Sequence, residues 1–455
     1  MSDSVPPTIA PHPPHRVLIL GGGFAGVETA QALEKLLGDR RDVEIWLVNQ
    51  DNFMLFTPLL PEVCSGHLEP RHVVSPLRAL VRRPSSWCIT AGVEQIDLEA
   101  RMVTVLGGDG DLHRLRYDTL VLALGGETAT FGIPGLEEHA AGMKTLADAF
   151  SLRNRLIEML ERAELEHDPG ERRAQLTFVI GGGGFSGVET AGEVEDFVRH
   201  VRKRYYPNIW EDEIQGYLVE LNDRLLAEMP TAMGRYAHRH LARRGYKILL
   251  NTAIKEVRAD EVVVGDGEVI PTRTVIWTGG VRPAPLVAAS GVECDKAGRA
   301  IVKPTMETSA EGVFAIGDCA AIPRGRRGDR YAPTAQNAVR EGKQLAANIL
   351  ARIDGGPLRP FRYQTIGTLA SIGAHTGVGV VFGVRVRGWL AWFMWRGYYW
   401  SRVPGFNRKV RVAIDWVLTA LFGADPVQLK VEDVRSALGS SGRRRPPLRD
   451  EKVKR

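Results

Sequence analysis

Cysteine is scarce in this sequence, and long apolar runs are missing. The 455 residues include only four cysteines, and no two of them lie close together in the chain: Cys64, Cys88, Cys294 and Cys319. This spacing argues against a disulfide framework, a zinc clamp and a dithiol redox pair. No run of about 18 uninterrupted apolar residues occurs, so we expect no helix that spans a membrane. Residues 1–15 are rich in proline and lack the basic-then-apolar order of a signal peptide.

Length and composition predict a globular protein with several domains. A chain of 455 residues is too long for one ordinary domain and fits two or three. Its hydrophobic share of 44% and charged share of 25% are typical of a folded, soluble protein. The net charge of +5 is modest and predicts no nucleic-acid partner. Lys and Arg nevertheless crowd roughly the last seventy positions, which favours contact with an anionic surface there.

A near-duplicated segment organises the chain. The sequence GGGFAGVETA at residues 21–30 returns as GGGFSGVETA at 182–191, about 160 residues later. Each copy follows a short apolar run, at 16–20 and 176–180, that is typical of a buried parallel strand. Each copy also opens a helix-like stretch, and we expect these helices to end near Leu37 and Arg204. A glycine-rich turn between a strand and a helix is the pattern of a dinucleotide-binding unit.

A physical requirement explains why glycine occurs at each of three positions in the repeated loop. Gly21 allows a tight turn out of the strand, Gly23 lets the backbone approach a pyrophosphate, and Gly26 lets the helix pack closely on the strand. The second copy repeats these positions as Gly182, Gly184 and Gly187. The helix N-terminus then offers free N–H groups and a positive dipole end to the phosphates. The two copies therefore predict two bound dinucleotides.

The residue that ends the second strand of each unit selects the nucleotide. Residues 217–220 are expected to form this strand in the second unit. The Glu220 carboxylate can accept from both ribose hydroxyls and repels a 2′-phosphate, which favours NADH over NADPH. The alternative is a solvated glutamate at a strand end. In the first unit the strand at 44–48 ends at Asn49, whose amide can also bond a ribose, though more weakly than a carboxylate.

Five further segments follow in a specific order: NFMLFTPLL at 52–60, YDTLVLALG at 117–125, WTGGVRP at 277–283, VFAIGDCA at 313–320 and PTAQNA at 333–338. Together with the paired glycine loops, they make the chain similar to the flavoproteins with two dinucleotide-binding domains. Within that group it resembles the type II NADH:quinone oxidoreductases, over residues 16–430. Gly125, Gly279 and Gly317 fall in these segments, and the resemblance implies that they line the cofactor sites.

The resemblance implies that the first loop, including Phe24 and Ala25, holds FAD. Asn49 would lie at the adenosine ribose, and Asp318 would bond the ribityl–pyrophosphate region. On its own, Asp318 could instead cap the following helix. Members of the family usually have an acid at the position of Asn49, so this chain departs from their pattern at the ribose.

The resemblance also implies that the second loop holds NADH, with Glu189 near the contact between nicotinamide and flavin. Glu193 lies one helical turn further on and is a second candidate. Spacing alone would equally allow either glutamate to form a surface salt bridge. Ala335 and Gln336 match an alanine–glutamine pair beside the flavin ring, where quinone docks, although Gln336 alone would suggest an ordinary helix-surface residue.

Two kinds of feature separate the chain from related flavoproteins. Disulfide reductases require a closely spaced cysteine pair early in the FAD domain, and no cysteine precedes Cys64. Sulfide:quinone reductases need cysteines that flank the flavin, and none lies between Cys88 and Cys294. Dithiol relay chemistry is therefore excluded. The family's aromatic–glutamine pair is replaced by residues 61–63, Pro-Glu-Val, which would reshape the entrance on the flavin side.

The composition changes after Gly388. Residues 389–400 contain four of the nine tryptophans in a stretch that we expect to be rich in turns, interrupted by Arg396. Residues 412–422 predict a helix with one polar stripe, formed with Arg411 by Asp415 and Thr419. A helix of this kind, with basic flanks and nearby Trp and Tyr, is suited to lie in a bilayer surface. The alternative is a helix pair packed on the core or at a dimer interface.

The sequence thus predicts an α/β fold with two Rossmann-like dinucleotide-binding domains and a C-terminal amphipathic helical module that docks on a membrane. The expected boundaries are a disordered N-terminus at 1–15, a discontinuous FAD domain at 16–149 and 281–360, an inserted NADH domain at 150–280, the docking module at 361–430 and a basic tail at 431–455. The tail would add attraction to anionic lipid or serve as a solubilising end.

The predicted activity is transfer of hydride from NADH to FAD and of two electrons to a membrane quinone, without proton pumping. The predicted location is peripheral, on the cytoplasmic face of a bacterial inner membrane, and assembly as a homodimer is left open. No metal site is predicted. One alternative is a soluble flavoprotein reductase of a protein or of oxygen. Another is a nucleotide-bound redox sensor or partner-binding protein that is not primarily an enzyme.

Overall fold

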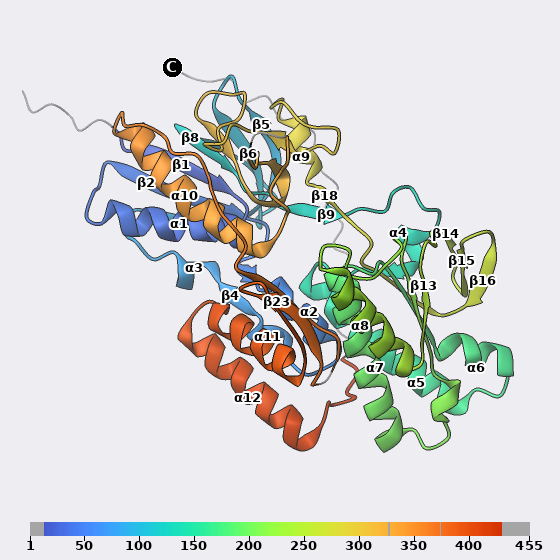
Figure 1. The fold of residues 1–455 in the computed structure, drawn as a ribbon. Helices are drawn as coiled ribbons and strands as arrows, with labels where there is room; N and C mark the ends of the chain where they lie inside the picture. The colour runs from blue at the N-terminus through green and yellow to red at the C-terminus, as the bar shows by residue number, and fades with distance from the viewer. Residues whose placement is uncertain (1–12, 326–327, 374, 430–455) are drawn as a thin grey trace, which may run out of the picture.

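The computed structural model describes residues 13–325, 328–373 and 375–429 of the 455-residue chain. Two sheets dominate these residues, one mixed and one parallel, and a strand in the middle of each leads directly into one of the two glycine loops (Figure 1). A smaller C-terminal unit of three strands and two helices contacts helices from both halves of the molecule. The predicted basic tail at 431–455 lies outside the described residues.

The first sheet contains the strand before the first glycine loop. Its strands in spatial order are β20 (Val313–Ala315), β8 (Thr119–Leu122), β1 (His15–Leu20), β2 (Val43–Asn49), β5 (Ser86–Asp97), β6 (Met102–Gly107) and β7 (Leu112–Arg116). The first five pair in parallel, and β5, β6 and β7 pair antiparallel. Because β20 comes from a segment almost 200 residues after β8, this sheet is built from two distant parts of the chain.

The second sheet contains the strand before the second glycine loop. Its strands in spatial order are β10 (Ala140–Ala141), β17 (Thr274–Trp277), β11 (Thr177–Gly181), β12 (Gln215–Val219) and β13 (Tyr246–Leu249), all parallel. A small antiparallel sheet lies beside it, formed by β14 (Ile254–Val257), β15 (Glu261–Val264) and β16 (Glu268–Pro271).

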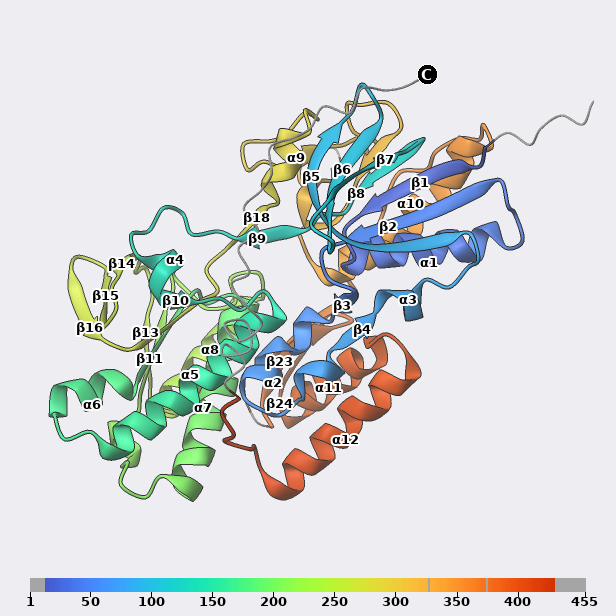
Figure 2. The ribbon, with the colours of Figure 1, turned by 180° about the vertical axis from the view of Figure 1, so that it is seen from behind.

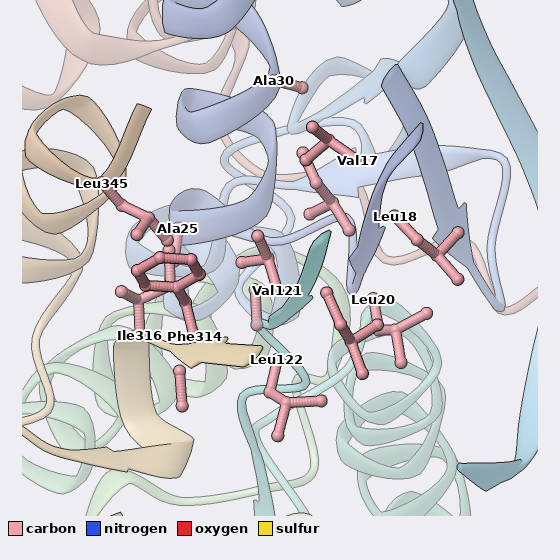
Figure 3. Close-up of a cluster of buried hydrophobic side chains, with 14 of the residues drawn as sticks. Val17, Leu18, Leu20, Ala25, Ala30, Val121, Leu122, Phe314, Ile316 and Leu345 are labelled. Atoms are coloured by element: carbon pink, nitrogen blue, oxygen red, sulfur yellow. The ribbon is translucent and has the colours of Figure 1, made fainter. Parts of the chain in front are cut away.

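Long helices cover both sheets (Figure 2). They are α1 (Phe24–Leu37) and α10 (Ala335–Ile353) on the first sheet, and α5 (Leu146–Leu165), α7 (Phe185–Tyr205) and α8 (Thr231–Arg243) around the second. The ends predicted for the two loop helices are confirmed to within one residue. Figure 3 shows Val17 and Leu20 of β1, Val121 of β8 and Phe314 of β20 in the apolar core below α1 and α10, all of them buried.

Short elements join these layers. They are β3 (Phe53–Leu55), β4 (Val74–Pro76), α2 (Leu60–Cys64), α3 (Leu77–Leu80), α4 (Leu136–His139), α6 (Pro169–Gln175), α9 (Pro285–Ala289), β19 (Ala300–Ile301), β21 (Ala320–Ala321) and the 3₁₀ turns η1 (Thr57–Leu59), η2 (Pro70–His72), η3 (Glu211–Glu213) and η4 (Gly317–Cys319).

The chain crosses between the two sheets at one antiparallel pair of strands. These are β9 (Gly126–Thr128) and β18 (Val281–Pro283), which run beside each other in both views (Figures 1 and 2). The boundary predicted at residue 150 falls inside α5, and β10 already belongs to the second sheet. We therefore propose that the inserted domain runs from β9 to β18, with its second crossing close to the predicted residue 281.

The C-terminal unit contains an element that the sequence did not predict. A three-stranded antiparallel sheet of β22 (Gly367–Ser371), β23 (Gly377–Val381) and β24 (Val384–Gly388) precedes its helices. The stretch expected to be rich in turns is helix α11 (Trp389–Arg402), so that expectation is wrong. Helix α12 (Phe406–Phe422) begins six residues earlier than predicted. Among the described residues, no helix combines the length and the apolarity that crossing a membrane requires.

Candidate functional site

Both glycine loops have a backbone that only glycine adopts without strain. Gly21 has φ +110° and Gly182 has φ +107°, the left-handed region that disfavours a Cβ. A Cβ on Gly21 would overlap the carbonyl oxygen of Ala123, and a Cβ on Gly182 would come within 2.8 Å of the Cα of Gly279. Each loop therefore packs directly against the end of a neighbouring strand.

The remaining loop glycines leave a cradle in front of each helix. No heavy atom lies within 4 Å of where a Cβ on Gly23 or Gly184 would stand, so the backbone there is open to a ligand. A Cβ on Gly26 would collide with the carbonyl oxygen of Gly21, and the second copy repeats this contact. Helices α1 and α7 have glycine at the N-cap and no side-chain cap. Their first N–H groups are therefore available to phosphates, and both cradles fit a dinucleotide.

The structure brings the predicted FAD residues together. Gly317 has φ +73°, and a Cβ there would lie 3.2 Å from Cβ of Ala25 in the first loop. Gly125 has φ +65° and follows β8, the strand beside β1. Phe24 packs edge-on against Phe56, with ring centroids 5.6 Å apart. The first loop and the two other predicted turns thus meet at the carboxyl ends of neighbouring parallel strands, where open α/β sheets bind ligands.

Asn49 and Glu220 perform the same structural task in the two units. Asn49 Oδ1 accepts from the N–H of Gly22 at 2.7 Å, and Glu220 Oε2 accepts from the N–H of Gly183. Asn49 Nδ2 donates to the carbonyl of Asp51 at 2.9 Å. An amide can therefore replace the usual acid as the support of the first loop, although it brings no negative charge to a ribose.

A buried glutamate that the sequence did not predict supports the Asp318 turn. Glu341 Oε2 accepts from the N–H of Gly317 at 2.8 Å, and burial raises the pKa of Glu341 to about 7. Asp318 itself forms an ion pair with Lys144 at 3.5 Å and remains partly exposed. The sequence signal that could have indicated this contact is Gly342, a glycine within a helix and next to Glu341. A Cβ at Gly342 would come within 2.7 Å of the α1 backbone, so α10 approaches α1 closely there.

Gln336 and Glu189 both contact strand β22. Gln336 Nε2 donates to the carbonyl of Gly367 at 3.3 Å, whereas Glu189 Oε1 accepts from the N–H of Ser371 at 3.1 Å. Four residues of strand separate these two contacts, or about 13 Å. Gln336 also accepts from the Tyr363 hydroxyl at 3.4 Å, so it is held by other groups rather than lying free on a helix surface.

Glu189 is a buried carboxyl group at the junction of three elements. It lies on α7, directly after the second glycine loop, and only 7% of it is exposed. Its Oε1 accepts from Ser371 of β22 and, at 2.8 Å, from Nε1 of Trp395 in α11. Burial outweighs these hydrogen bonds and raises the pKa of Glu189 to about 8. At neutral pH this carboxyl group therefore holds a proton.

Glu193 is also buried, so the surface salt-bridge interpretation is wrong for both glutamates. Glu193 Oε2 accepts from Ser65 Oγ at 2.6 Å and lies 2.7 Å from Nδ1 of His67. Although burial alone would raise the pKa of Glu193, His67 and Ser65 outweigh it and lower this pKa. Glu193 is therefore the ionised neighbour of a protonated Glu189.

Glu62 is the second site residue whose role the sequence did not predict. It is 1% exposed, and burial raises its pKa. Arg396 of α11 donates to Glu62 at 3.2 Å, and Trp416 of α12 donates to it at 2.5 Å. The Arg396 guanidinium lies between the rings of Trp392 and Trp416, at 4.4 and 4.6 Å from their centroids. The arginine that interrupts the tryptophan-rich stretch thus points into the protein and fixes both C-terminal helices.

The polar stripe of α12 faces the protein, and its apolar face is exposed. Asp415 accepts from Nδ1 of His72 at 2.6 Å, and Thr419 donates to the carbonyl of His67 at 3.2 Å. Large apolar side chains that are 39–81% exposed cover the outer faces of α11 and α12: Trp389, Leu390, Phe393, Trp400, Phe406, Val410, Ile414, Val417, Leu418, Leu421 and Phe422. An ordinary amphipathic helix on a soluble protein buries its apolar face and exposes its polar face, so α12 has the opposite orientation.

Comparison with known proteins gives matches along nearly the whole chain. The family model for pyridine nucleotide-disulphide oxidoreductases matches residues 15–342, and the model for the NDH2 C-terminal domain matches residues 366–425. The fold is similar to the structure of NDH2 from Plasmodium falciparum in complex with NADH, with a TM-score of 0.82 at 19% identity, over 91% of this chain and 99% of that one.

Two curated relatives align over most of their own length. The internal alternative NAD(P)H-ubiquinone oxidoreductase A1 of Arabidopsis thaliana mitochondria is 33% identical, over 93% of this chain and 87% of the relative. The type II NADH:quinone oxidoreductase Ndh of Mycobacterium tuberculosis is 31% identical, over 92% of this chain and 91% of the relative. The resemblance and the fold class drawn from the sequence are therefore confirmed, and the chain belongs to the type II NADH:quinone oxidoreductase family.

Proposed function

We propose that this protein is an FAD-dependent NADH:quinone oxidoreductase that does not pump protons. The observation that carries the proposal is the placement of Glu189, a buried carboxyl group that joins the second glycine-loop helix to β22 and α11. Family membership supports the same activity, since the aligned relatives are named for NADH and quinone. When bound, FAD supplies the redox chemistry by taking hydride from NADH and passing two electrons to quinone.

The two cradles have the task of holding the nucleotides in a productive orientation. The first loop, with Asn49, the Gly125 turn and the Gly317–Asp318 turn, would hold FAD. The second loop, with Gly279 beside it, would hold NADH. The Glu220 carboxylate lies beside this loop and disfavours a 2′-phosphate, so we propose a preference for NADH. Hydride transfer depends mainly on stacking of the nicotinamide and flavin rings and on the distance between them. These residues would therefore contribute by orienting the two nucleotides.

Glu189 and Gln336 have different tasks in this proposal. Because Glu189 holds a proton at neutral pH, it can donate that proton when quinone is reduced. Gln336 is held by β22 and Tyr363, and Ala335 beside it is the first residue of α10. We therefore assign Gln336 to orienting the quinone, and Glu189 to proton transfer near the contact between nicotinamide and flavin.

The exposed apolar face of α11 and α12 is the proposed membrane contact. A chain with so many large apolar side chains on one surface needs a partner for them. Arg402, Arg408 and Lys409 lie at the same helices and suit anionic headgroups. We propose that the protein binds peripherally to the membrane that contains its quinone, and that this is the cytoplasmic face of a bacterial inner membrane.

The acceptor test compares quinone with oxygen. Purified protein with its bound flavin is given NADH and either a short-chain quinone or air-saturated buffer, and the oxidation of NADH is followed. We expect oxidation with quinone to be at least about a hundredfold faster, the contribution expected of positioned acid–base catalysis. Equal rates with both acceptors would remove the quinone assignment and favour a soluble reductase of oxygen.

The membrane test is sedimentation with liposomes of neutral or anionic lipid. We expect the protein to sediment with both, and more completely with anionic lipid at low salt. A protein that stays in the supernatant and behaves as a dimer would instead assign the apolar face to contact between two copies of this chain.

A further inference from the structure

A buried charged cluster lies next to Glu189 and has contacts that proton donation alone does not require. We call it the junction cluster, and it contains Glu62, Ser65, His67, Glu193 and Arg396. Ser65 and His67 both reach the same oxygen of Glu193, at 2.6 and 2.7 Å. Ser65 and His67 are also within 2.9 Å of each other. The cluster therefore forms a continuous set of hydrogen bonds from α7 to the loop after α2.

The carboxyl groups of the junction cluster favour the protonated form of Glu189. Glu193 and Glu62 both raise the pKa of Glu189, and each of them is paired with a cationic side chain of its own, Glu62 with Arg396 and Glu193 with His67. An ionised Glu189 would add a further buried negative charge beside these two carboxyl groups, which is costly in a low-dielectric interior. The other titratable or charged groups around the cluster are not among the groups that shift the pKa of Glu189: Cys64, Arg153, Asp196, His200 and Tyr399.

The cluster connects two buried carboxyl groups, Glu189 and Glu193, with the more exposed side chain of His67. Glu189 is 7% exposed as a residue, the Glu193 side chain is 5% exposed, and the His67 side chain is 19% exposed. Glu189 and Glu193 are one helical turn apart on α7, where Cβ atoms lie about 5–6 Å from each other. That separation is short enough for one water molecule to bridge the carboxyl groups.

We propose that His67 and Glu193 return a proton from water to Glu189 in each turnover. The overall reaction, NADH + H⁺ + quinone → NAD⁺ + quinol, consumes one proton, and this inference rests on the proposed function. When quinone is reduced, the O–H bond of Glu189 breaks and one of the two O–H bonds of quinol forms, while the second hydrogen and both electrons come from the hydride of NADH. A proton then passes from His67 through Glu193 to Glu189, and His67 regains one from water. His67 and Glu193 are positioning residues here, because they act through Glu189.

The chain contains a matched pair that serves as a control. His72 Nδ1 lies 2.6 Å from Asp415, and these side chains are 14% and 9% exposed, close to the values for His67 and Glu193. Asp415 also accepts from the backbone of Glu69, and Arg411 lies 3.4 Å from the other nitrogen of His72. This pair joins η2 to α12, and neither residue contributes to the electrostatics of Glu189.

The first measurement follows proton exchange in the resting enzyme. Rapid mixing into D₂O shifts the infrared carboxylic C=O band of Glu189, which is assigned by its loss in Glu189→Gln. We expect this shift to be at least about tenfold slower in Glu193→Gln and in His67→Gln, and unchanged in His72→Gln. The exchange needs no quinone, so it remains informative if quinone proves not to be the acceptor. Unchanged exchange in both cluster variants would overturn the proposal.

The second measurement separates the two half-reactions by anaerobic stopped flow. We expect the cluster variants to keep the rate of flavin reduction by NADH within about twofold, and to lose about tenfold in reoxidation by excess quinone over repeated turnovers, with a larger loss as pH rises. Glu193→Asp keeps a carboxylate and should recover part of the lost rate. Equal loss in both half-reactions, or an equal loss in His72→Gln, would show that the cluster only supports the fold.

Discussion

The repeated loop places a glutamate at the same position in both copies, Glu28 in α1 and Glu189 in α7, and the two residues have different surroundings. Glu28 forms an ion pair at 3.4 Å with Lys343 of α10, and both side chains remain in contact with water. Glu189 is covered by β22 and α11, and no cation is among the groups that shift its pKa. The chemistry of this position therefore comes from the C-terminal unit that covers α7, and not from the repeated loop.

The covering of α7 is visible in its backbone contacts as well. Gly192 follows Glu189 by three residues, and a Cβ there would overlap the backbone of Ile372 and Gly373. The corresponding helix α1 is covered by α10, which meets it at Gly342. The helix of one copy is thus covered by α10, whereas the helix of the other copy is covered by the C-terminal unit.

The largest expected effect is on stability at alkaline pH. Glu189 has an ordinary pKa of 4.5 that is raised to about 8 in the folded protein, so the wild type loses stability as pH rises between these values. Glu189→Gln has no proton to lose. It should be more stable than the wild type by roughly 4 kcal/mol above about pH 8 and equal to it below about pH 4.5. Denaturant unfolding at both ends of this range measures the difference.

The control for that measurement is Glu28→Gln, for which we expect a change under about 0.5 kcal/mol at either pH. If Glu189→Gln shifted stability by the same amount at both pH values, the wild-type carboxyl group would not be titrating between them. Glu28 and Glu189 would then differ in their packing and not in their titration.

Turnover is the next largest effect. Glu189→Gln should lower NADH–quinone turnover about a hundredfold because the proton donor is lost, whereas Glu28→Gln should stay within about twofold of the wild type. Steady-state rates at saturating NADH, normalised to bound flavin, measure this contrast. Similar losses in both variants would mean that the covering module does not distinguish the two glutamates.

Substitutions on the outer face of α12 test whether the C-terminal unit, which covers α7, also binds a membrane. Leu418→Glu and Leu421→Glu place a charge on the apolar face and should each weaken binding to liposomes by about tenfold or more. Leu165→Glu is the matched control, because Leu165 is 77% exposed at the end of α5. Sedimentation over a series of lipid concentrations gives the partition coefficients. Equal weakening by all three substitutions would point to a general effect of charge.

The smallest expected effects concern Asn49 and Glu220. Glu220→Gln should reduce the preference for NADH over NADPH by about tenfold, because the charge that opposes a 2′-phosphate is removed. Asn49→Asp should leave this preference unchanged and slow the loss of flavin by a few-fold, roughly 1 kcal/mol. Values of kcat/KM for both nucleotides and the rate of flavin release test the pair. A changed nucleotide preference in Asn49→Asp would contradict the assignment of the two loops.

The parts of the fold that depend on local spacing could be predicted from the sequence. The strand before each glycine loop, the helix after it and the turn residues Gly21 and Gly182 lie where the repeat places them. These features are set within about thirty residues, the length of one βαβ unit. Asn49 and Glu220 were likewise found because they end a strand of that unit.

The parts that depend on distant contacts could not be predicted in this way. Glu62 and Arg396 are 334 positions apart in the chain, and no pattern within either segment indicates their ion pair. The stretch at 389–400 contains Gly397 and many aromatic residues, which favour helix only weakly. Burial of Trp395 and the contacts of Arg396 make it helical, and these depend on the packing of α11 against β22, α2 and α12.

The most direct test of the central role of Glu189 is anaerobic stopped flow of the wild type and Glu189→Gln in the two half-reactions, from about pH 6 to about pH 9. We predict that flavin reduction by NADH is similar in both proteins. Reoxidation by quinone should fall in the wild type as pH rises through about 8, and should be slow and independent of pH in the variant. Fast reoxidation of Glu189→Gln with the wild-type pH dependence would contradict the account.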